Sequence, residues 1–341
     1  MFYGEIFADF IELSLFLVGM YYVAVGVFSL FGRCEADEPD IEPLSFAVII
    51  PAHNEERVIA RAVSSILNAD YPKEKINVYV IADNCTDNTA YIAERLRVNV
   101  IRKTAASSGK SAALQAAARH ILNSGDVPEC ITVIDADNLV DSGYFRAMNR
   151  AVRRYSVVQG RIEAKNPEQN WLTAAYSVWG ALETRLGRLA PHNIGLNVKL
   201  SGTGYCARSE VFRELMTLGE CLAEDIEYTA YLALAGVRTG FANSAVVYDE
   251  KPAKLSSSLR QRVRWARGIV DAQGRYGLKL LMRVKITDFL SLYGDFLGVF
   301  TYAVFCVISI FATAGMLHDI QFPLCGFWAN PISYAALNIY L

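Results

Sequence analysis

The sequence predicts an α/β protein in which a mainly parallel sheet is covered by helices and is flanked in the chain by membrane helices. Two observations lead to this prediction. Between residues 45 and 134, short apolar runs alternate with segments of helical periodicity, a pattern typical of a parallel sheet with both faces covered. Before and after the α/β region, the chain has an uncharged apolar stretch close to the ~20 residues that a bilayer requires.

Composition excludes several classes of protein. The 341 residues and their 53% hydrophobic content exceed what one ordinary globular core needs. The net charge of −2 gives no indication of a nucleic-acid partner. The seven cysteines have irregular spacing and form no CxxC pair, which is typical of a reduced compartment and argues against a zinc site.

The predicted membrane helices cover residues 13–31 and 296–317. Acidic residues precede the first, and its apolar run is too long for a signal peptide, so we interpret it as an uncleaved anchor. Eight Lys and Arg residues lie between 260 and 285, before the second helix, and none follows it. This asymmetry predicts an integral plasma-membrane protein whose middle part is cytoplasmic.

The α/β region begins with an apolar run at 45–50, followed by helical spacing over 55–68. Further strands are predicted at 76–82, 98–102 and 130–134, and further helices at 89–96 and 111–122. Ligands of such sheets bind beyond the carboxyl ends of the strands. The polar residues that follow each predicted strand are therefore the candidate site.

The first three strand ends carry distinct polar residues. Asn54 and Glu55 either begin a helix, as cap and first-turn acid, or bind a ligand. Asp83 stands where the second strand emerges, too early to cap the next helix. The loop 104–110 ends in Ser-Gly-Lys before another Ser, but Thr104 stands where the Walker motif requires Gly, which argues against an NTPase.

The fourth strand is followed by Asp135-Ala136-Asp137. Two carboxylates two residues apart point the same way if the backbone stays extended. They repel each other unless a divalent cation links them to phosphate oxygens. The pair is therefore either a solvated turn or the site of Mg²⁺ or Mn²⁺ on a diphosphate.

Two later segments are also candidates. Glu224 and Asp225 are either ordinary acids of a helical first turn or catalytic acids. The segment 201–211 contains small residues, among them Gly202 and Thr203, where a sugar can approach the backbone. The other interpretation of this segment is an ordinary loop and helix cap.

The segment 261–265 reads Gln-Arg-Val-Arg-Trp. On a helix, Gln261, Arg264 and Trp265 share one face, which presents an amide, a guanidinium and an indole. Such a face fits a flat or anionic group. The alternative is an amphipathic helix over 256–270 that lies on anionic lipid of the inner leaflet. Both interpretations can hold at once.

These motifs together resemble the catalytic domain of glycosyltransferase family 2, which has the GT-A fold, and especially its membrane-embedded synthases of cellulose, chitin, hyaluronan and poly-N-acetylglucosamine. The resemblance covers 46–268, and the motifs occur in matching order and spacing: PAHNEE at 51–56, DNCTDNT at 83–89, GKSAAL at 109–114, DAD at 135–137, AED at 223–225 and QRVRW at 261–265. Two positions depart from it. Ala82 stands where many members have a second acid, and Ala223 where many have Thr.

The resemblance implies a role for each motif. A UDP-sugar would be bound by Pro51, Asn54, Glu55, Asp83, Lys110, Asp135, Gln261 and Arg264. Asp135 and Asp137 would hold Mg²⁺ or Mn²⁺, Asp225 beside Glu224 would be the catalytic base, and Trp265, Gly202 and Thr203 would contact the acceptor. One base without a protein nucleophile implies a single displacement with inversion, so an α-linked donor would give a β linkage.

The predicted organisation is a membrane helix (1–33), a GT-A domain (34–255), an interfacial segment (256–288), a second membrane helix (289–318) and the start of a further span (319–341). Residues 331–341 resemble the beginning of a further apolar span and carry no polar tail. Either the chain is truncated, or the membrane part is completed by a second copy of the chain or by a channel partner.

The predicted function is that of a processive hexosyltransferase moving GlcNAc or Glc from a UDP-sugar to a growing β-linked polysaccharide. One alternative is transfer of a single sugar to a lipid phosphate carrier, which QRVRW argues against. The other is an inactive membrane scaffold or nucleotide sensor, which the intact acids argue against.

Overall fold

The computed structural model describes residues 2–31, 41–104, 109–219 and 221–294. The chain divides into two compact units. One is Phe28–Leu292, and the other comprises Met1–Val27 and Tyr293–Leu341. All the predicted site residues lie in the unit Phe28–Leu292.

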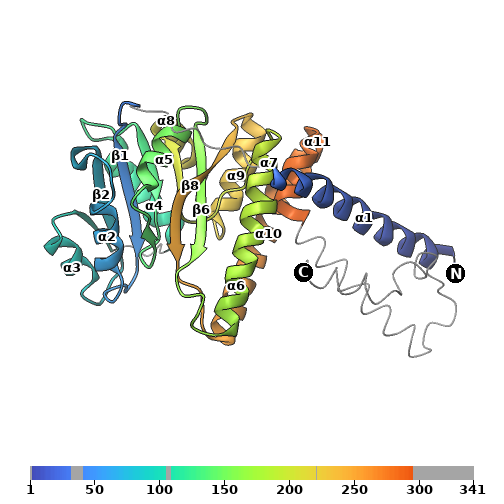
Figure 1. Cartoon of the computed structure of the whole chain (residues 1–341), viewed down its shortest axis with the longest axis horizontal. Coiled ribbons are helices and arrows are strands. Elements are labelled where there is room, and N and C mark those ends of the chain that lie inside the picture. Colours follow the sequence, from blue (N-terminus) through green and yellow to red (C-terminus); the bar gives the residue numbers. More distant parts are fainter. Residues whose placement is uncertain (1, 32–40, 105–108, 220, 295–341) are drawn as a thin grey trace. The chain divides into compact units, whose positions relative to one another are not determined.

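This unit is built around a sheet with the strand order β3-β2-β1-β4-β7-β6-β8-β5 (Figure 1). The strands are β1 (Phe46–Ala52), β2 (Ile76–Asp83), β3 (Asn99–Lys103), β4 (Cys130–Val133), β5 (Leu139–Val140), β6 (Val157–Ala164), β7 (Tyr205–Arg208) and β8 (Thr239–Asp249). β1 is parallel to β2 and β4, and β2 is parallel to β3. The parallel sheet predicted from residues 45–134 is confirmed for these four strands.

The sheet changes direction at β7, which is antiparallel to both β4 and β6. β6 and β8 are parallel to each other, and β5 is antiparallel to β8. The whole sheet is therefore mixed. The second half could not be read from the alternation of strands and helices, because its strands pair with partners that are distant in the sequence.

Helices cover both faces of the sheet (Figure 1). The α-helices of this unit are α2 (Ile59–Leu67), α3 (Thr89–Arg95), α4 (Lys110–Leu122), α5 (Tyr144–Ala151), α6 (Trp171–Leu182), α7 (Ala190–Asn193), α8 (Ser209–Leu215), α9 (Glu224–Ala235), α10 (Leu255–Ala272) and α11 (Leu278–Met282). Short helices are η1 (Phe28–Leu30) and η2 (Lys73–Lys75), and η3 (Glu183–Leu189) and η4 (Gln273–Gly277) are π-helices.

Alternate residues of β1 enter two different cores because successive side chains of a strand point to opposite faces. Phe46 and Val48 pack in a cluster with residues of α2 and α5. Ala47 and Ile49 pack in a second cluster with residues of α4, α8 and α9. β1 is thus buried on both faces, as expected for a central parallel strand.

The predicted helix at 55–68 is shorter than expected, since α2 begins at Ile59. Asn54 has a left-handed backbone with φ 58°. Its side-chain oxygen accepts a hydrogen bond from the Thr86 backbone N–H at 2.8 Å. The interpretation of Asn54 as a helix cap is therefore wrong, because this residue links the turns after β1 and β2 instead.

The other local predictions for the α/β region agree closely with the structure. β2, α3, β3, α4 and β4 begin and end within one residue of the predicted bounds. The helix expected over 256–270 is α10. α9 ends where Gly236 takes a left-handed conformation with φ 75°, which is a common way to stop a helix.

The second unit contains α1 (Phe2–Val27). In the part of the chain that the structure describes, no helix meets both the length and the apolarity needed to cross a bilayer. The membrane helix predicted at 13–31 is thus not confirmed. The span predicted at 296–317 and the tail 331–341 lie outside the described residues.

Candidate active site

Lys110, the first residue of α4, joins two of the predicted acidic motifs. Its Nζ lies 2.5 Å from Asp135 Oδ1 and 3.5 Å from Glu224 Oε1, and donates to the Gly202 carbonyl at 2.5 Å. Burial lowers the pKa of Lys110, but the charges of Asp135 and Glu224 outweigh burial and raise the pKa above its ordinary value. One ammonium thus links the end of β4 to the start of α9.

Asp225 lies beside this ammonium in the first turn of α9. One of its carboxylate oxygens accepts a hydrogen bond from the Ile226 N–H at 2.9 Å. Burial and the charge of Glu224 raise the pKa of Asp225 to about 6, although the charge of Lys110 lowers it. A carboxylate with this pKa is ionised near neutral pH and is a better base than an ordinary Asp.

Gly202 lies between these charged groups. A β-carbon built on Gly202 would stand 3.1 Å from Lys110 Nζ, 3.6 Å from Glu224 Oε1 and 4.0 Å from Asp225 Oδ2. A side chain at this position would therefore crowd the site. The structure brings Gly202 together with the predicted base.

The DAD segment forms a turn rather than an extended strand end. The backbone N–H of Asn138 donates to the Asp135 carbonyl at 3.0 Å, which closes the turn. The extended backbone on which Asp135 and Asp137 were expected to point the same way is therefore not present. The Asp135 carboxylate contacts Lys110, while burial and the charges of Asp249 and Asp135 raise the pKa of Asp137 to about 7.

A buried hydrogen-bond network supports this turn. With its amide oriented to satisfy its neighbours, Asn138 donates to Asp137 Oδ1 and Asp249 Oδ1 at 2.9 Å each and accepts from Thr203 Oγ1 at 2.9 Å. Thr203 Oγ1 also accepts from the Asp135 N–H at 3.1 Å. The hydroxyl of Thr203, predicted to contact an acceptor, is thus already engaged with the acidic turn.

Asp249 is a site residue that the sequence analysis missed. It is the last residue of β8 and pairs with Ala164 of β6. Burial raises the pKa of Asp249, while Lys251, whose Nζ lies 2.5 Å from Asp249 Oδ2, lowers it. The signal in the sequence was an acid at the end of an apolar strand, the same pattern that singled out Asp135.

Asp135, Asp137 and Asp249 form an acidic edge of the sheet. This acidic edge fits a divalent cation that is shared with a substrate. Among the residues described, no three His, Cys, Asp or Glu side chains are arranged to hold a metal by themselves. Mg²⁺ typically takes only one or two carboxylates and completes its shell with substrate phosphates and water. The pKa of Asp137 is raised because burial and the charges of Asp249 and Asp135 destabilise its ionised form. A cation at Asp135 and Asp137 would relieve both effects.

Asp83 anchors the loop that leads to Lys110. Its carboxylate accepts from Lys103 Nζ at 2.7 Å and from the Gly109 N–H at 2.8 Å. Asp83 is only 4% exposed. Asn84 Nδ2 also donates to Asp83 Oδ1 at 3.1 Å. The predicted contact with a UDP-sugar therefore has to compete with three partners from the protein itself.

The turn after β1 is held against the turn after β2. Pro51 lies within β1 and pairs with Ile81. The Glu55 backbone N–H donates to Thr89 Oγ1 at 2.8 Å. Burial, followed by the charges of Asp87 and Asp135, raises the pKa of Glu55. The Glu55 carboxylate is therefore close enough to Asp135 for the two negative charges to repel each other.

The QRVRW segment lies on α10, which touches the start of α9. A β-carbon built on Gly268 of α10 would stand 2.4 Å from the Ala223 β-carbon. Gln261 Oε1 is buried and has no hydrogen-bond partner among the described residues. Arg264 and Trp265 are exposed. The structure does not show these two side chains in contact with the acids, but they lie on the helix that packs against the AED turn.

Arg188 is a second residue that the sequence did not indicate. It lies on the π-helix η3, is 5% exposed, and its Nη2 donates to Ser201 Oγ at 2.6 Å. Burial lowers the pKa of Arg188, whereas the charges of Glu183 and Asp225 raise it. π-helices are frequent at functional sites, and this one places a buried cation near the predicted base.

Comparison with known proteins agrees with this arrangement. A sequence profile described as glycosyltransferase like family 2 matches residues 43–268, the stretch that contains all the groups above. The chain belongs to glycosyltransferase family 2. The predicted family is thereby confirmed.

Relatives with similar sequences are named after different activities. The "Probable glycosyltransferase YdaM" of Bacillus subtilis is 28% identical over 239 residues, 65% of this chain and 54% of that protein. An N-acetylglucosaminyltransferase of Azorhizobium caulinodans is 29% identical over 252 residues, 67% and 61% of the two chains. A beta-monoglucosyldiacylglycerol synthase of Nostoc sp. is 29% identical over 272 residues, 75% and 56%. The chain spans little more than half the length of these relatives.

A solved structure shows the same fold. The mannosyltransferase PcManGT from Pyrobaculum calidifontis, in complex with GDP-Man and Mn²⁺, superposes with a TM-score of 0.68 at 18% identity, covering 97% of this chain and 92% of that one. The predicted GT-A fold of family 2 is confirmed. These comparisons do not separate the polymer-making branch from other members.

Proposed function

We propose that this protein is an inverting glycosyltransferase that moves a sugar, GlcNAc or Glc in the first place, from its UDP donor to a growing β-linked polysaccharide at the cytoplasmic face of the plasma membrane. One observation supports a direct transfer with inversion. Lys110 contacts both Asp135 and Glu224. This contact supports the proposal, because it joins the turn of Glu224 and Asp225 to Asp135 of the DAD motif.

The reaction needs one displacement. Asp225 takes the proton of the acceptor hydroxyl, the hydroxyl oxygen forms a bond to the anomeric carbon, and the bond from that carbon to the diphosphate breaks. In this proposal the Lys110 ammonium, which contacts Asp135, would stabilise the negative charge that develops on the departing nucleotide. Mg²⁺ or Mn²⁺ bound at Asp135 and Asp137 would supply further stabilisation of that charge.

In this proposal, side chains of α10 bind the acceptor. Its contact between Gly268 and Ala223 fixes the helix against the turn that carries Asp225. Trp265 is 43% exposed and offers an apolar face to a sugar ring. Gln261 Oε1, buried without a partner among the described residues, can accept a hydrogen bond from a sugar hydroxyl.

A lipid acceptor is the second candidate, and a specific observation favours it. α10 exposes Leu255, Leu259 and Val263, each 51% to 55% exposed, on the same helix as Trp265. Large exposed apolar side chains in one helix favour contact with lipid or another apolar surface. Several relatives with matching sequences are named beta-monoglucosyldiacylglycerol synthase.

A donor and product assay tests both candidates. The purified protein is given UDP-GlcNAc, UDP-Glc or GDP-mannose with Mg²⁺ or Mn²⁺, and nucleotide release is measured against Asp225→Asn as the blank. The labelled product is then extracted into organic solvent and sized on a gel. We expect a high-molecular-weight ladder from one UDP-sugar. A single sugar in the organic phase would favour the lipid acceptor, and release no greater than the blank from any donor would contradict both.

A further inference from the structure

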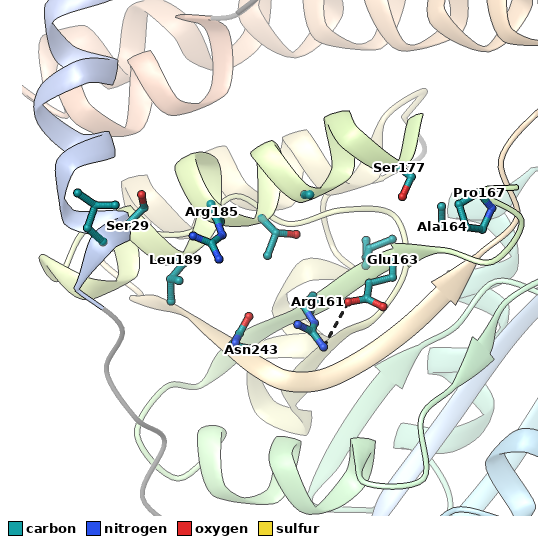
Figure 2. Close-up of a pocket in the computed structure, with 13 residues that line it drawn as sticks. Ser29, Arg161, Glu163, Ala164, Pro167, Ser177, Arg185, Leu189 and Asn243 are labelled. Carbon is teal, nitrogen blue, oxygen red and sulfur yellow. Dashed lines mark ion pairs between the residues drawn. The ribbon is translucent and has the colours of Figure 1, made fainter. Parts of the chain in front are cut away.

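A cavity of about 590 Å³ lies between β6, β8, α6 and η3 (Figure 2). None of the acids described above lines it. Polar side chains from all four elements line it: Arg161 and Glu163 from β6, Asn243 from β8, Ser177 from α6, and Thr184 and Arg185 from η3. We call it the Arg161–Arg185 cavity. Nothing in the proposed transfer reaction uses it.

The cavity contains more positive charge than the protein neutralises. Arg161 Nη2 lies 3.3 Å from Glu163 Oε1, but Arg161 Nε is buried and donates to no acceptor among the described residues. The Arg185 guanidinium lines the cavity and has no ion-pair or hydrogen-bond partner within the part of the chain that the structure describes. Two guanidinium groups therefore face a single carboxylate, and a buried N–H remains without a partner, which is rare in a folded protein.

The chemistry of the lining favours a phosphate group over other anions. A guanidinium binds phosphate through two parallel hydrogen bonds. Ser177 and Thr184 carry hydroxyl groups that can donate to further oxygens. A carboxylate has two oxygens and would leave some of these donors unsatisfied, whereas a phosphate ester has more. We propose that the Arg161–Arg185 cavity is a second ligand site, which binds the phosphate of a phosphate ester between Arg161 and Arg185.

The cavity extends toward the transfer site without overlapping it. Ala164, at the end of β6, lines the cavity and pairs with Asp249 of the acidic edge. At about 3.3 Å per strand residue, Arg161 lies roughly 10 Å along β6 from that pair. A phosphate at Arg161 is therefore distinct from the diphosphate of the donor, and both can be bound together. The inference is independent of which acceptor the enzyme uses.

Calorimetric titration of the full chain with glycerol 3-phosphate tests the site. The protein is first saturated with UDP and Mg²⁺, so that the donor site is filled, and ionic strength is held constant. We expect saturable binding. Arg185→Gln should weaken it about tenfold or more, because a charge-assisted hydrogen bond is lost. Arg185 is exposed, so this replacement leaves core packing intact.

Two further variants sharpen the test. Glu163→Gln should strengthen binding, because it removes a negative charge from the cavity and releases Arg161 from its ion pair. Arg61→Gln, an exposed arginine on α2, is the matched control and should bind like the original protein. No saturable heat, or equal weakening by Arg185→Gln and Arg61→Gln, would overturn the proposal. Weaker binding in Glu163→Gln would also overturn it.

The source of the phosphate is identified with lipid nanodiscs. The protein is placed in phosphatidylcholine alone or with phosphatidic acid, and the titration with glycerol 3-phosphate is repeated. If phosphatidic acid blocks the titration in the original protein and this block is lost in Arg185→Gln, the phosphate belongs to a lipid headgroup. If the titration is the same in both discs, the site takes a soluble phosphate ester.

Discussion

Gly268 of α10 is packed against Ala223, the residue before Glu224 and Asp225, so closely that a β-carbon on Gly268 would stand 2.4 Å from that of Ala223. The two small residues let the helix of the QRVRW segment approach the turn of the predicted base. Ala223 is also a position where many members of the resembled synthases have Thr. This contact links the helix of the QRVRW segment to the turn that carries Asp225.

Gly268→Ala should therefore separate α10 from α9. The new β-carbon meets an atom fixed to the backbone, so the helices must move, at a cost of roughly 1–3 kcal/mol. We expect sugar transfer to fall more than UDP-sugar binding, measured by turnover and by donor titration. Gly274→Ala is the control, since no heavy atom lies within 4 Å of its added β-carbon. Equal activity of the two variants would contradict the role of this contact.

Asp225→Asn should abolish transfer and leave donor binding intact, because it removes the base without removing a residue of the acidic edge. In the unaltered enzyme, kcat/KM should depend on pH through the Asp225 pKa of about 6. The base must be ionised, so kcat/KM should fall about tenfold per pH unit below this value and reach a plateau above it. A profile without an inflection between pH 5 and 7 would place the base elsewhere.

Asp137→Asn should remove metal-dependent activity, and EDTA should have the same effect on the original protein. The variant should also change stability in the absence of metal. Because the folded-state pKa of Asp137 is raised from 3.8 to about 7, the stability that its protonated form contributes is present below pH 3.8 and lost as the pH rises to about 7. The variant avoids this loss.

We therefore expect metal-free Asp137→Asn to melt at a higher temperature than the original protein at pH 8 and to differ less at pH 5. Asp126→Asn, a change at an exposed acid, should shift the melting temperature little at either pH. A metal-free Asp137→Asn that is less stable at pH 8 would show that the Asp137 carboxylate is not destabilised in the folded protein.

Trp265→Ala should weaken the use of acceptor more than the binding of donor, because the indole is proposed to stack on the acceptor ring. Trp179 on α6 is equally exposed at 43% and provides a matched control. Initial rates over a range of acceptor concentrations, together with donor titration, distinguish the two effects. The stacking role fails if Trp265→Ala and Trp179→Ala reduce acceptor use to the same extent.

Local patterns predicted much of the catalytic unit. The first four strands followed from apolar runs, and Asp83, Asp135 and Asp225 followed from their places at strand ends or in a helical first turn. The DAD turn was not predicted, because its geometry depends on a backbone hydrogen bond from Asn138 to Asp135. Asp249 was missed although it ends an apolar strand, and Arg188 was missed because what marks it is burial beside the charges of Glu183 and Asp225.

Over residues 76–134, the sequence by itself determined where strands and helices begin and end and which acids follow the strands, because periodicity and turn chemistry act over a few neighbouring residues. Only the tertiary structure decided which of those groups meet. Lys110 reaches the Gly202 carbonyl and Glu224, and no local pattern links residues so far apart in the chain. The raised pKa values of Asp225 and Asp137 likewise arise from burial and from neighbouring charges, which exist only once the sheet and its helices have assembled.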